Sequence, residues 1–377
     1  GIDEPKKYGI PYEAEAMIHG RTNHMMNSHD PAAMAETLKK LKFQLSIVQF
    51  IDETAEFADV ILPDAHDFER WDMFPANDPY AFIAPGPGNW HFLFRQPAAE
   101  PPGEAKPWTE IYLEIAERMG FLSEIYTLGN DMWNLGADYR LDPAKKYTIR
   151  EIAERQARTI FGADFSLSAI TTTSASVLRE KTVQEAYPRT FLPSRVPIYL
   201  EYLLDHRRDV QAVLDQLGFT WNLDTYSPVP KWFPCEAHDH CGPDELIATN
   251  NKVPTHQFST STENIWIDEV ARANPYTYSV MMHTSAAERR KLKTGDLVCV
   301  ESRYGKYVGR LRVTELVHPE SVNCSGSFGH WAKGLPVSNG RGVLHNALLP
   351  KPTLDRIDTL SGQIDQCVAV RVYKVED

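Results

Sequence analysis

The chain has 377 residues, 42% of them hydrophobic and 24% charged, which is the composition of an ordinary folded protein with room for two or three domains. Its formal net charge of −12 argues against nucleic-acid binding through the usual basic surface, although local N–H donors can still hold a phosphorylated ligand. No apolar run approaches the roughly 20 residues that a membrane-spanning helix needs.

The start of the chain and its cysteines add two expectations. The chain begins at Gly1 with neither an initiator Met nor a signal peptide, and we therefore expect a fragment, a processed chain or one half of a split subunit. Five cysteines are too few, and odd in number, for a disulfide framework, which favours a reducing compartment. Export of the folded protein is compatible with the same composition, so cytoplasmic and periplasmic locations both stay open.

Residues 14–50 follow the pattern of an α/β unit. A strand is predicted at 14–20, a polar loop at 21–28, and a helix that starts at Pro31 with Asp30 as its N-cap. A nearly continuous apolar strand follows at 43–50. A strand–helix–strand unit of this kind favours a parallel sheet that binds ligands at the carboxyl ends of its strands.

Acidic side chains follow the second of these strands. Asp52 can cap a short helix at 53–58, and a buried strand at 60–62 ends at Pro63. A carboxylate accepts hydrogen bonds from the amino and imino groups of guanine, which makes Asp52 or Glu53 chemically suited to a guanosine. The alternative is that these carboxylates are solvated side chains at the start of a helix.

Helices are predicted in the middle of the chain, and a small β-barrel in its last third. Apolar stripes predict helices at 107–120, 148–160 and 200–217. Two alternating strands around a turn at Tyr304 and Gly305 predict a hairpin of the barrel. We expect part of an α/β domain with a truncated parallel sheet at 1–130, a mainly helical segment at 131–225, a proline-rich linker at 226–244 and a six-stranded type of β-barrel at 245–377.

The linker also holds two cysteines and two histidines within seven residues: Cys235, His238, His240 and Cys241. This composition is typical of a zinc site, and a zinc hydrolase is the function it would indicate. The spacing is too tight for all four side chains to reach one tetrahedral ion comfortably. A linker without metal is therefore favoured over a structural zinc.

Several motifs occur in an order that resembles molybdopterin oxidoreductases of the dimethyl-sulfoxide-reductase type. The letters ETA at 53–55, ADVILP at 58–63 and ER at 69–70 resemble the family's "ETA…ADVVLP…ER" signature. Asn23 stands in the family's Asn-Pro loop, with His24 in place of the proline. The stretches PGEAK at 102–106 and RVPIYLE at 195–201 also match, and the barrel resembles the family's C-terminal molybdopterin-dinucleotide-binding domain. The resemblance covers the C-terminal half of a catalytic subunit.

The resemblance implies an enzyme that uses bis(molybdopterin guanine dinucleotide) with molybdenum or tungsten. The implied reaction is two-electron redox chemistry on a small substrate, by oxygen or sulfur transfer, hydroxylation or dehydroxylation. A non-redox hydratase of the same family and a non-catalytic cofactor-binding or assembly subunit are the alternatives. The implied partners are the N-terminal half of the catalytic subunit, which would carry an iron–sulfur cluster, and an iron–sulfur electron-transfer subunit. No protein ligand to the metal is identified in this chain.

A pterin dinucleotide needs amides, hydroxyls, imidazoles and N–H groups on rigid loops. In the α/β part, the candidates for the guanosine and its phosphates are Asn23, Gln49, Asp52, Glu53 and Thr54. In the barrel the candidates are loop residues: Thr249, His256, Ser259, Thr260, His283, Gly329, His330, Trp331, Asn346 and Gln363. His330 is also the candidate catalytic residue, as a proton carrier. The alternatives are a Ser/Thr-rich turn near 249–262, a helix N-cap at Ser285 and an ordinary loop histidine at 330.

Overall fold

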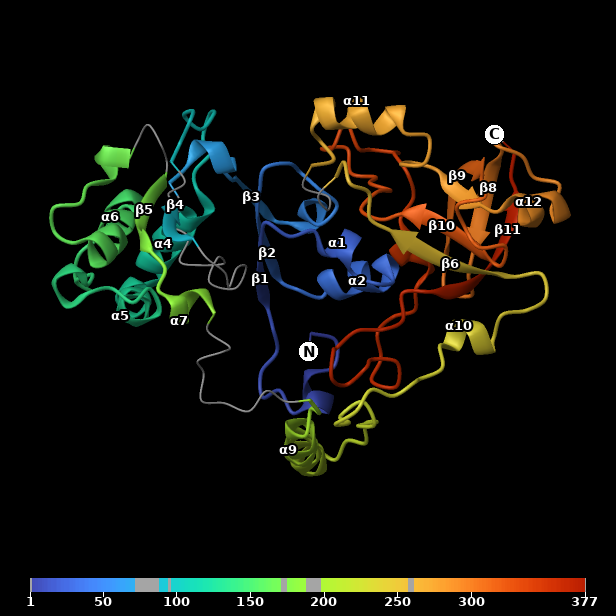
Figure 1. Cartoon of the computed structure of the whole chain (residues 1–377), viewed down its shortest axis with the longest axis horizontal. Coiled ribbons are helices and arrows are strands. Elements are labelled where there is room, and N and C mark those ends of the chain that lie inside the picture. Colours follow the sequence, from blue (N-terminus) through green and yellow to red (C-terminus); the bar gives the residue numbers. More distant parts are fainter. Residues whose placement is uncertain are drawn as a thin grey trace. The chain divides into compact units, whose positions relative to one another are not determined.

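The computed structural model describes residues 2–71, 88–93, 96–170, 175–187, 198–256 and 261–376. Its elements are drawn in Figure 1. The chain divides into two compact units, one made of Gly1–Ile61 and Pro197–Asp377 and the other of Leu62–Val196. The first unit therefore contains both the N-terminal strands and the C-terminal barrel, which are separated in the sequence by the second unit.

The N-terminal strands form a three-stranded sheet in the order β1-β2-β3, with β1 (Ala16–Gly20) and β2 (Phe43–Val48) in parallel register and β3 (Val60–Pro63) next to β2. The crossover contains α1 (His24–Asn27) and α2 (Pro31–Leu38). Helix α2 starts as predicted, because Ala33 N donates to Asp30 Oδ1 at 3.0 Å. The predicted helix at 53–58 is shorter, a single 3₁₀ turn, η2 (Ala55–Phe57).

Helices dominate the second unit. They are α4 (Trp108–Met119), α5 (Leu122–Met132), α6 (Ile149–Phe161) and α7 (Val183–Ala186), and β4 (Asn89–Leu93) pairs antiparallel with β5 (Ala175–Glu180). Short 3₁₀ turns lie at Asp67–Glu69, Ala137–Tyr139 and Leu167–Ile170. The core contains Tyr126, Ile149 and Ile152, which are fully buried. Helices α4 and α6 confirm the predictions at 107–120 and 148–160.

The chain returns to the first unit through α9 (Tyr202–Leu217), which confirms the third predicted helix, and α10 (Glu236–Asp239). A closed barrel follows, in the order β10-β6-β11-β8-β9-β7. Its strands are β6 (Leu246–Asn251), β7 (Val280–Met282), β8 (Leu297–Glu301), β9 (Lys306–Val313), β10 (Ser321–Ser325) and β11 (Val368–Lys374). The α11 (Ile265–Ala273), α12 (Thr284–Arg289) and η6 (His345–Leu348) segments join them. The predicted fold class, a parallel-sheet α/β part followed by a six-stranded barrel, is confirmed.

The barrel is closed around an apolar core that includes Leu246, Val280, Val298 and Val370. It mixes strand directions: β10 runs parallel to β6 and β7 runs parallel to β9, whereas β10 with β7, β11 with β6 and β8, and β8 with β9 are antiparallel. In the part of the chain that the structure describes, no helix combines the length and the hydropathy that crossing a bilayer requires.

The loop after β10 is packed tightly against two other backbone segments. Gly329 has φ +90°, and a Cβ there would lie 2.3 Å from Leu344 N. A Cβ on Gly334 would lie 2.2 Å from Ile51 O, in the segment that follows β2. The absence of a side chain at Gly334 lets the barrel loop approach the end of the N-terminal sheet, and its absence at Gly329 lets the loop pack against the backbone at Leu344.

Changing Gly329 to Ala should destabilise this loop more than changing Gly340 to Ala. Gly340 also has a positive φ, +71°, but its Cβ would meet nothing within 4 Å. Backbone strain alone should cost G340A about 1 kcal/mol, whereas strain and overpacking together should cost G329A about 3 kcal/mol. Urea unfolding of the two variants measures both free energies. Equal losses would show that the close approach to Leu344 is not needed.

Candidate functional site

A buried carboxylate joins the end of the N-terminal sheet to the barrel. Glu53 follows β2 and is fully buried. Its Oε1 accepts hydrogen bonds from Trp331 N at 2.8 Å and Ala332 N at 3.1 Å, and Asn23 Nδ2 donates to its Oε2 at 2.7 Å. His330 Nδ1 lies 3.1 Å from both carboxylate oxygens. We call Glu53, Asn23, Thr54 and the 330–332 segment the Glu53 cluster.

The donors around Glu53 stabilise its negative charge. Burial raises the pKa of this carboxyl, but the hydrogen bonds and charge of His330, with further bonds from Asn23 and Ala332, outweigh burial and lower the pKa to about 2. An ionised carboxylate without such partners would be costly to bury in a chain that already carries a net charge of −12. The cluster is therefore a fixed anion held by N–H groups.

The same cluster holds the two sheet-end loops together. Thr54 is fully buried; its hydroxyl donates to Asn23 Oδ1 at 2.9 Å and accepts from Met25 N at 3.1 Å. Asn23 thus bonds to Thr54 through its oxygen and to Glu53 through its nitrogen. The loops after β1 and β2 meet at the carboxyl end of the sheet, as the sequence predicts for a parallel sheet.

One nitrogen of His330 has no partner among the described residues. The residue is 3% exposed, and its Nε2 makes no hydrogen bond to them. His330 Nδ1 faces the ionised Glu53 and donates to it, so Nε2 is the ring nitrogen that points away from the carboxylate without a partner among the described residues. A buried polar atom of this kind calls for an explanation, and a bound ligand is one of the usual ones. Ser325 Oγ, at the end of β10, is a second such atom.

Asp52 lies beside the cluster and accepts hydrogen bonds through one oxygen. Its Oδ1 accepts from Thr54 N at 3.0 Å and from Ala55 N, the first residue of η2, at 2.9 Å, although the N-cap position of this shorter helix is Thr54 and not the predicted Asp52. Burial, with a smaller contribution from the charge of Glu53, raises the pKa of Asp52 to about 6. Gln49 is exposed directly after β2. Both residues stand where the sequence predicts a nucleotide.

Three barrel candidates form protein contacts at the same loops. Trp331 is 43% exposed, although its backbone N–H is used by Glu53. Gly329 N donates to Arg341 O at 2.8 Å. Asn346 Nδ2 donates to Met26 O at 2.9 Å, so this side chain ties η6 to α1. These contacts give the three residues structural roles, and their contact with a cofactor stays a prediction.

Other barrel candidates have their polar atoms engaged elsewhere in the barrel. His256 Nδ1 lies 3.2 Å from Ser261 Oγ and its Nε2 lies 3.3 Å from Tyr278 Oη. His283 accepts from Ser285 N through Nδ1 at 3.1 Å, so His283, and not Ser285, is the N-cap of α12. Thr249 Oγ1 accepts from Asn323 Nδ2 at 2.8 Å. Ser259 and Thr260 lie outside the described residues.

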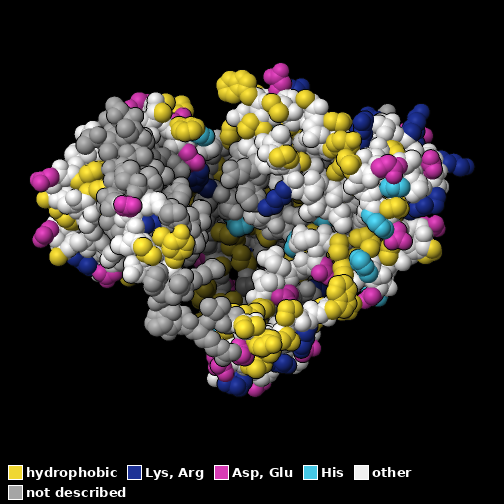
Figure 2. All heavy atoms as spheres, viewed as in Figure 1, with side chains coloured by type: hydrophobic (Ala, Val, Ile, Leu, Met, Phe, Trp, Pro, Cys, Tyr) yellow, Lys and Arg dark blue, Asp and Glu magenta, His cyan; other side chains and the backbone are white. Residues whose placement is uncertain are grey.

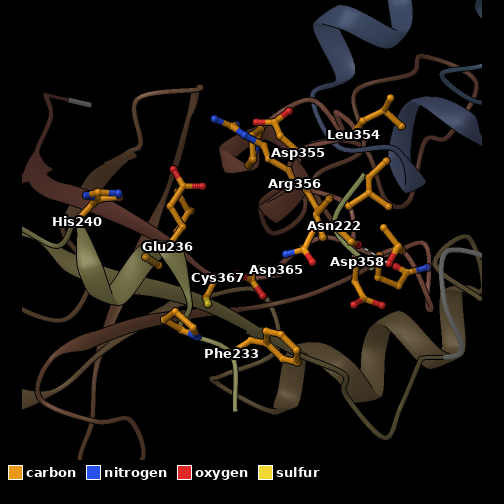
Figure 3. A pocket seen from close by; sticks show the side chains of 18 of the residues that line it. Asn222, Phe233, Glu236, His240, Leu354, Asp355, Arg356, Asp358, Asp365 and Cys367 are labelled. Atoms are coloured by element: carbon orange, nitrogen blue, oxygen red, sulfur yellow. Dashed lines mark hydrogen bonds between the residues drawn. The ribbon is translucent and has the colours of Figure 1, made fainter. Parts of the chain in front are cut away.

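Gln363 lines a different site, a cavity of about 880 Å³. Figure 3 shows that side chains of both signs of charge surround this cavity, among them Glu236, Arg356, Asp358 and Asp365. The walls come from the segment after α9, from the linker and α10, from the β8–β9 turn and from residues that precede and begin β11. The described contacts do not bring Gln363 into the Glu53 cluster.

The structure gives no support to the zinc interpretation of the linker. Within residues 198–256, which contain the whole 235–241 cluster, and in the other described ranges, no three His, Cys, Asp or Glu side chains converge to hold a metal ion. Cys241 Sγ instead contacts Gly242 O at 3.8 Å.

The backbone part of the cluster could not be found from sequence patterns. Trp331 N and Ala332 N are the donors that hold Glu53, and a backbone donor leaves no mark in the residue type. Gly334 was also missed, although a glycine shortly after a polar loop is a signal of close backbone approach.

Replacing Glu53 with Gln should destabilise the first unit by about 3 kcal/mol, because an amide cannot serve all of the N–H donors that now meet an anion. Glu56 provides the matched control. It is exposed, and its contact with the same loop is a long one, 3.4 Å from Lys333 N. E56Q should lose under about 0.5 kcal/mol. Chemical denaturation gives both values, and an E53Q variant as stable as E56Q would contradict the role assigned to the buried carboxylate.

Asp52 and Glu53 should affect the pH dependence of stability in opposite directions: a rise in pH should weaken the contribution of Asp52, and a fall in pH should weaken that of Glu53. The folded pKa of Asp52, about 6, lies above the reference value of 3.8, so its contribution to stability falls as the pH rises from about 4 to about 6. The contribution of Glu53, with a pKa of about 2, is present above about 4.5 and is lost as the pH falls toward 2. The melting temperature of D52N minus that of the wild type should therefore increase from pH 4 to 6 and stay constant above pH 7. A difference that is flat from pH 4 to 7 would exclude the raised pKa.

Comparison with known proteins finds two family models on this chain. "Molybdopterin oxidoreductase" matches residues 10–118, and "Molydopterin dinucleotide binding domain" matches residues 246–363. The chain is 23% identical over 355 residues to the thiosulfate reductase molybdopterin-containing subunit PhsA of Salmonella typhimurium, which covers 91% of this chain and 42% of that protein. It is 34% identical over 318 residues to the probable oxidoreductase YoaE of Bacillus subtilis, covering 83% of this chain and 37% of that protein.

The chain thus spans about two fifths of the length of these curated relatives. Among solved structures, acetylene hydratase from Pelobacter acetylenicus matches with a TM-score of 0.62 and 16% identity, over 98% of this chain and 46% of that one, a likeness of fold. The two family models lie in the predicted order and contain the two sides of the Glu53 cluster. The chain belongs to the molybdopterin oxidoreductase family, alongside molybdoenzymes of the dimethyl-sulfoxide-reductase type.

Proposed function

We propose that this chain is the cofactor-binding half of a molybdenum or tungsten bis-pterin enzyme that carries out two-electron redox chemistry on a small substrate. The observation that carries the proposal is the Glu53 cluster. It joins a sheet-end loop in the molybdopterin oxidoreductase region to a barrel loop in the dinucleotide-binding region. Loops from both regions therefore meet at one place, at the strand ends where an α/β sheet usually binds a nucleotide.

The donors and acceptors at this place fit a pterin nucleotide. His330 Nε2 is a buried polar atom without a partner in the described residues, and so is Ser325 Oγ at the end of β10, the strand that precedes the His330 loop. Asp52 accepts hydrogen bonds at the start of η2 through Oδ1, and among the described residues Oδ2 is left for a ligand. A pterin or guanine edge offers N–H donors and ring acceptors together, which matches imidazole, hydroxyl and carboxylate partners. When bound, the metal of such a cofactor would supply or accept the two electrons. Asn23, Gln49 and Trp331 would surround the same ligand.

Glu53 would act on the ligand through His330. The carboxylate already accepts hydrogen bonds from four residues, so little of its capacity is left for a nucleotide. Its effect is to hold the imidazole in one orientation, with the proton at Nδ1. Nε2 would then accept a hydrogen bond from the pterin, and this position is also suited to holding a proton for a substrate.

We further propose that the remainder of a larger catalytic subunit, with its iron–sulfur cluster, packs against this chain, and that an iron–sulfur subunit transfers the electrons. Helix α11 exposes Ile265 by 58%, Trp266 by 72% and Val270 by 61%. Figure 2 shows hydrophobic side chains at the surface over this helix. Exposed apolar groups of this size are typical of protein contact surfaces.

A non-redox hydration is the second candidate, and the likeness to acetylene hydratase motivates it. A likeness of fold at 16% identity gives no residue-level support for that reaction. The two candidates differ in electron balance. Turnover that requires a stoichiometric electron donor or acceptor supports the redox proposal, and turnover without one supports hydration.

The His330 proposal can be tested with two variants that remove different ring nitrogens. The H330N variant keeps an amide donor near the position of Nδ1, where it can bond to Glu53, and removes Nε2. The H330Q variant keeps an amide group near the position of Nε2 and loses the donor at Nδ1. In the assembled enzyme, H330N should melt close to the wild type but retain pterin and metal roughly tenfold less tightly. H330Q should instead lower the melting temperature.

Metal analysis and pterin quantification after gel filtration measure the retention. The wild-type assembly should contain molybdenum or tungsten with about two pterins per metal, as the family's bis-pterin cofactor requires. Active, anaerobically purified enzyme with neither metal would refute the proposed function. Full retention of pterin by H330N would leave the function intact and remove His330 from the site.

A further inference from the structure

Two cysteines that are distant in the sequence lie next to each other beside the barrel. Cys235 Sγ and Cys367 Sγ are 3.1 Å apart, although 132 positions separate them in the chain. Both side chains are partly exposed, and both are free thiols here. We propose that Cys235 and Cys367 form a reversible disulfide that fastens the linker to the last strand of the barrel.

Both cysteines are held by ordered neighbours. Cys235 is the N-cap of α10, and its carbonyl accepts from His238 N at 3.0 Å. Cys367 immediately precedes β11, which pairs with β6 and β8 inside the barrel. Glu236, the neighbour of Cys235, forms an ion pair with Arg303 at the β8–β9 turn. The meeting of the two sulfur atoms is therefore supported on both sides by the fold.

The bond would enclose most of the dinucleotide-binding domain. Strands β6 to β10 and the whole matched region 246–363 lie between the two cysteines. A crosslink that closes a loop of this length strongly reduces the conformational entropy of the unfolded chain. The folded barrel needs little rearrangement to form the bond, because the sulfur atoms are already adjacent. The expected consequence is a barrel that melts at a higher temperature in its oxidised form.

The reaction balances as an ordinary thiol–disulfide exchange with a small-molecule disulfide as oxidant. The Cys235 thiolate attacks one sulfur of the oxidant, which breaks its S–S bond and releases one small thiolate. Cys367 then attacks Cys235 Sγ, forms the protein disulfide and releases the second small thiolate. In total the two protein thiols lose two protons and two electrons, and the small disulfide is reduced to two thiols.

The surroundings define the path of the oxidant to the pair. Burial and the neighbouring Cys235 raise the pKa of Cys367 to about 12. Cys367 lines the cavity of about 880 Å³, together with Glu236 and Asp365 (Figure 3). The cavity thus borders the Cys367 side of the pair, and Cys235, which is partly exposed without lining the cavity, is open to a small disulfide from solvent.

The remaining cysteines provide controls. Cys299 and Cys324 are buried in the barrel, at 2% and 0% exposure. Cys241 is in the same linker as Cys235 and is also partly exposed, but its sulfur contacts the Gly242 carbonyl oxygen and not a second thiol. C241S is thus a matched control for C235S.

The test is carried out on the complete enzyme, purified under reducing conditions and then exposed to oxidised glutathione. Peptide mass spectrometry should find one new crosslink, between Cys235 and Cys367, in the wild type and in C241S. The same oxidation should raise the melting temperature of both proteins by at least about 5 °C. It should give neither the crosslink nor the rise in C235S and C367S, and dithiothreitol should reverse both effects.

Three results would overturn the proposal. They are free thiols at both positions after oxidation, glutathione held stably on Cys235 with Cys367 still reduced, and a bond from Cys235 to Cys241 in place of Cys367. Should C235S fail to fold, C367S gives the same comparison from the barrel side. The crosslink in wild-type protein can be measured without either variant.

Discussion

The buried Glu53 carboxylate is the interaction on which the organisation of the first unit depends. It is an anion with no solvent contact in an acidic chain, and donors from two distant segments hold it. The sheet-end loop supplies Asn23, and the barrel loop supplies His330 and two backbone N–H groups. Losing one of these partners while the carboxylate stays buried would leave a charge or a donor unsatisfied, which is costly.

This arrangement connects packing with chemistry. Gly334 lets the barrel loop approach Ile51, Gly329 lets it pack against Leu344, and the 330–332 segment between these glycines contacts the acid. The acid in turn orients the imidazole of His330 and leaves Nε2 without a partner among the described residues. If the proposed function holds, stability and cofactor binding share one set of atoms. The proposed cysteine clip acts at another part of the barrel and does not depend on this cluster.

Much of the fold could be predicted because it rests on local patterns. The apolar strand at 43–50, the Asp30–Pro31 helix start and the hairpin around Gly305 each have a short-range signal, and each is present in the structure. The contact of Glu53 with His330 has no such signal, since 277 positions separate the two residues. The sequence patterns likewise could not show that His283 caps α12, because a histidine N-cap is uncommon and Ser285 is the preferred residue type. Candidate side chains were easier to predict from the sequence than the partners they bond to, and backbone donors could not be predicted at all.

An experimental structure of the assembled, cofactor-loaded enzyme tests the central claim most directly. In that structure Glu53 should keep its bonds to Asn23, Trp331 and Ala332, and an atom of the pterin nucleotide should lie within about 3.2 Å of His330 Nε2. A Glu53 side chain turned away from the barrel loop to face the ligand would contradict the role assigned to this carboxylate. A nucleotide bound elsewhere in the chain, with His330 Nε2 still unpaired, would contradict the proposed cofactor site.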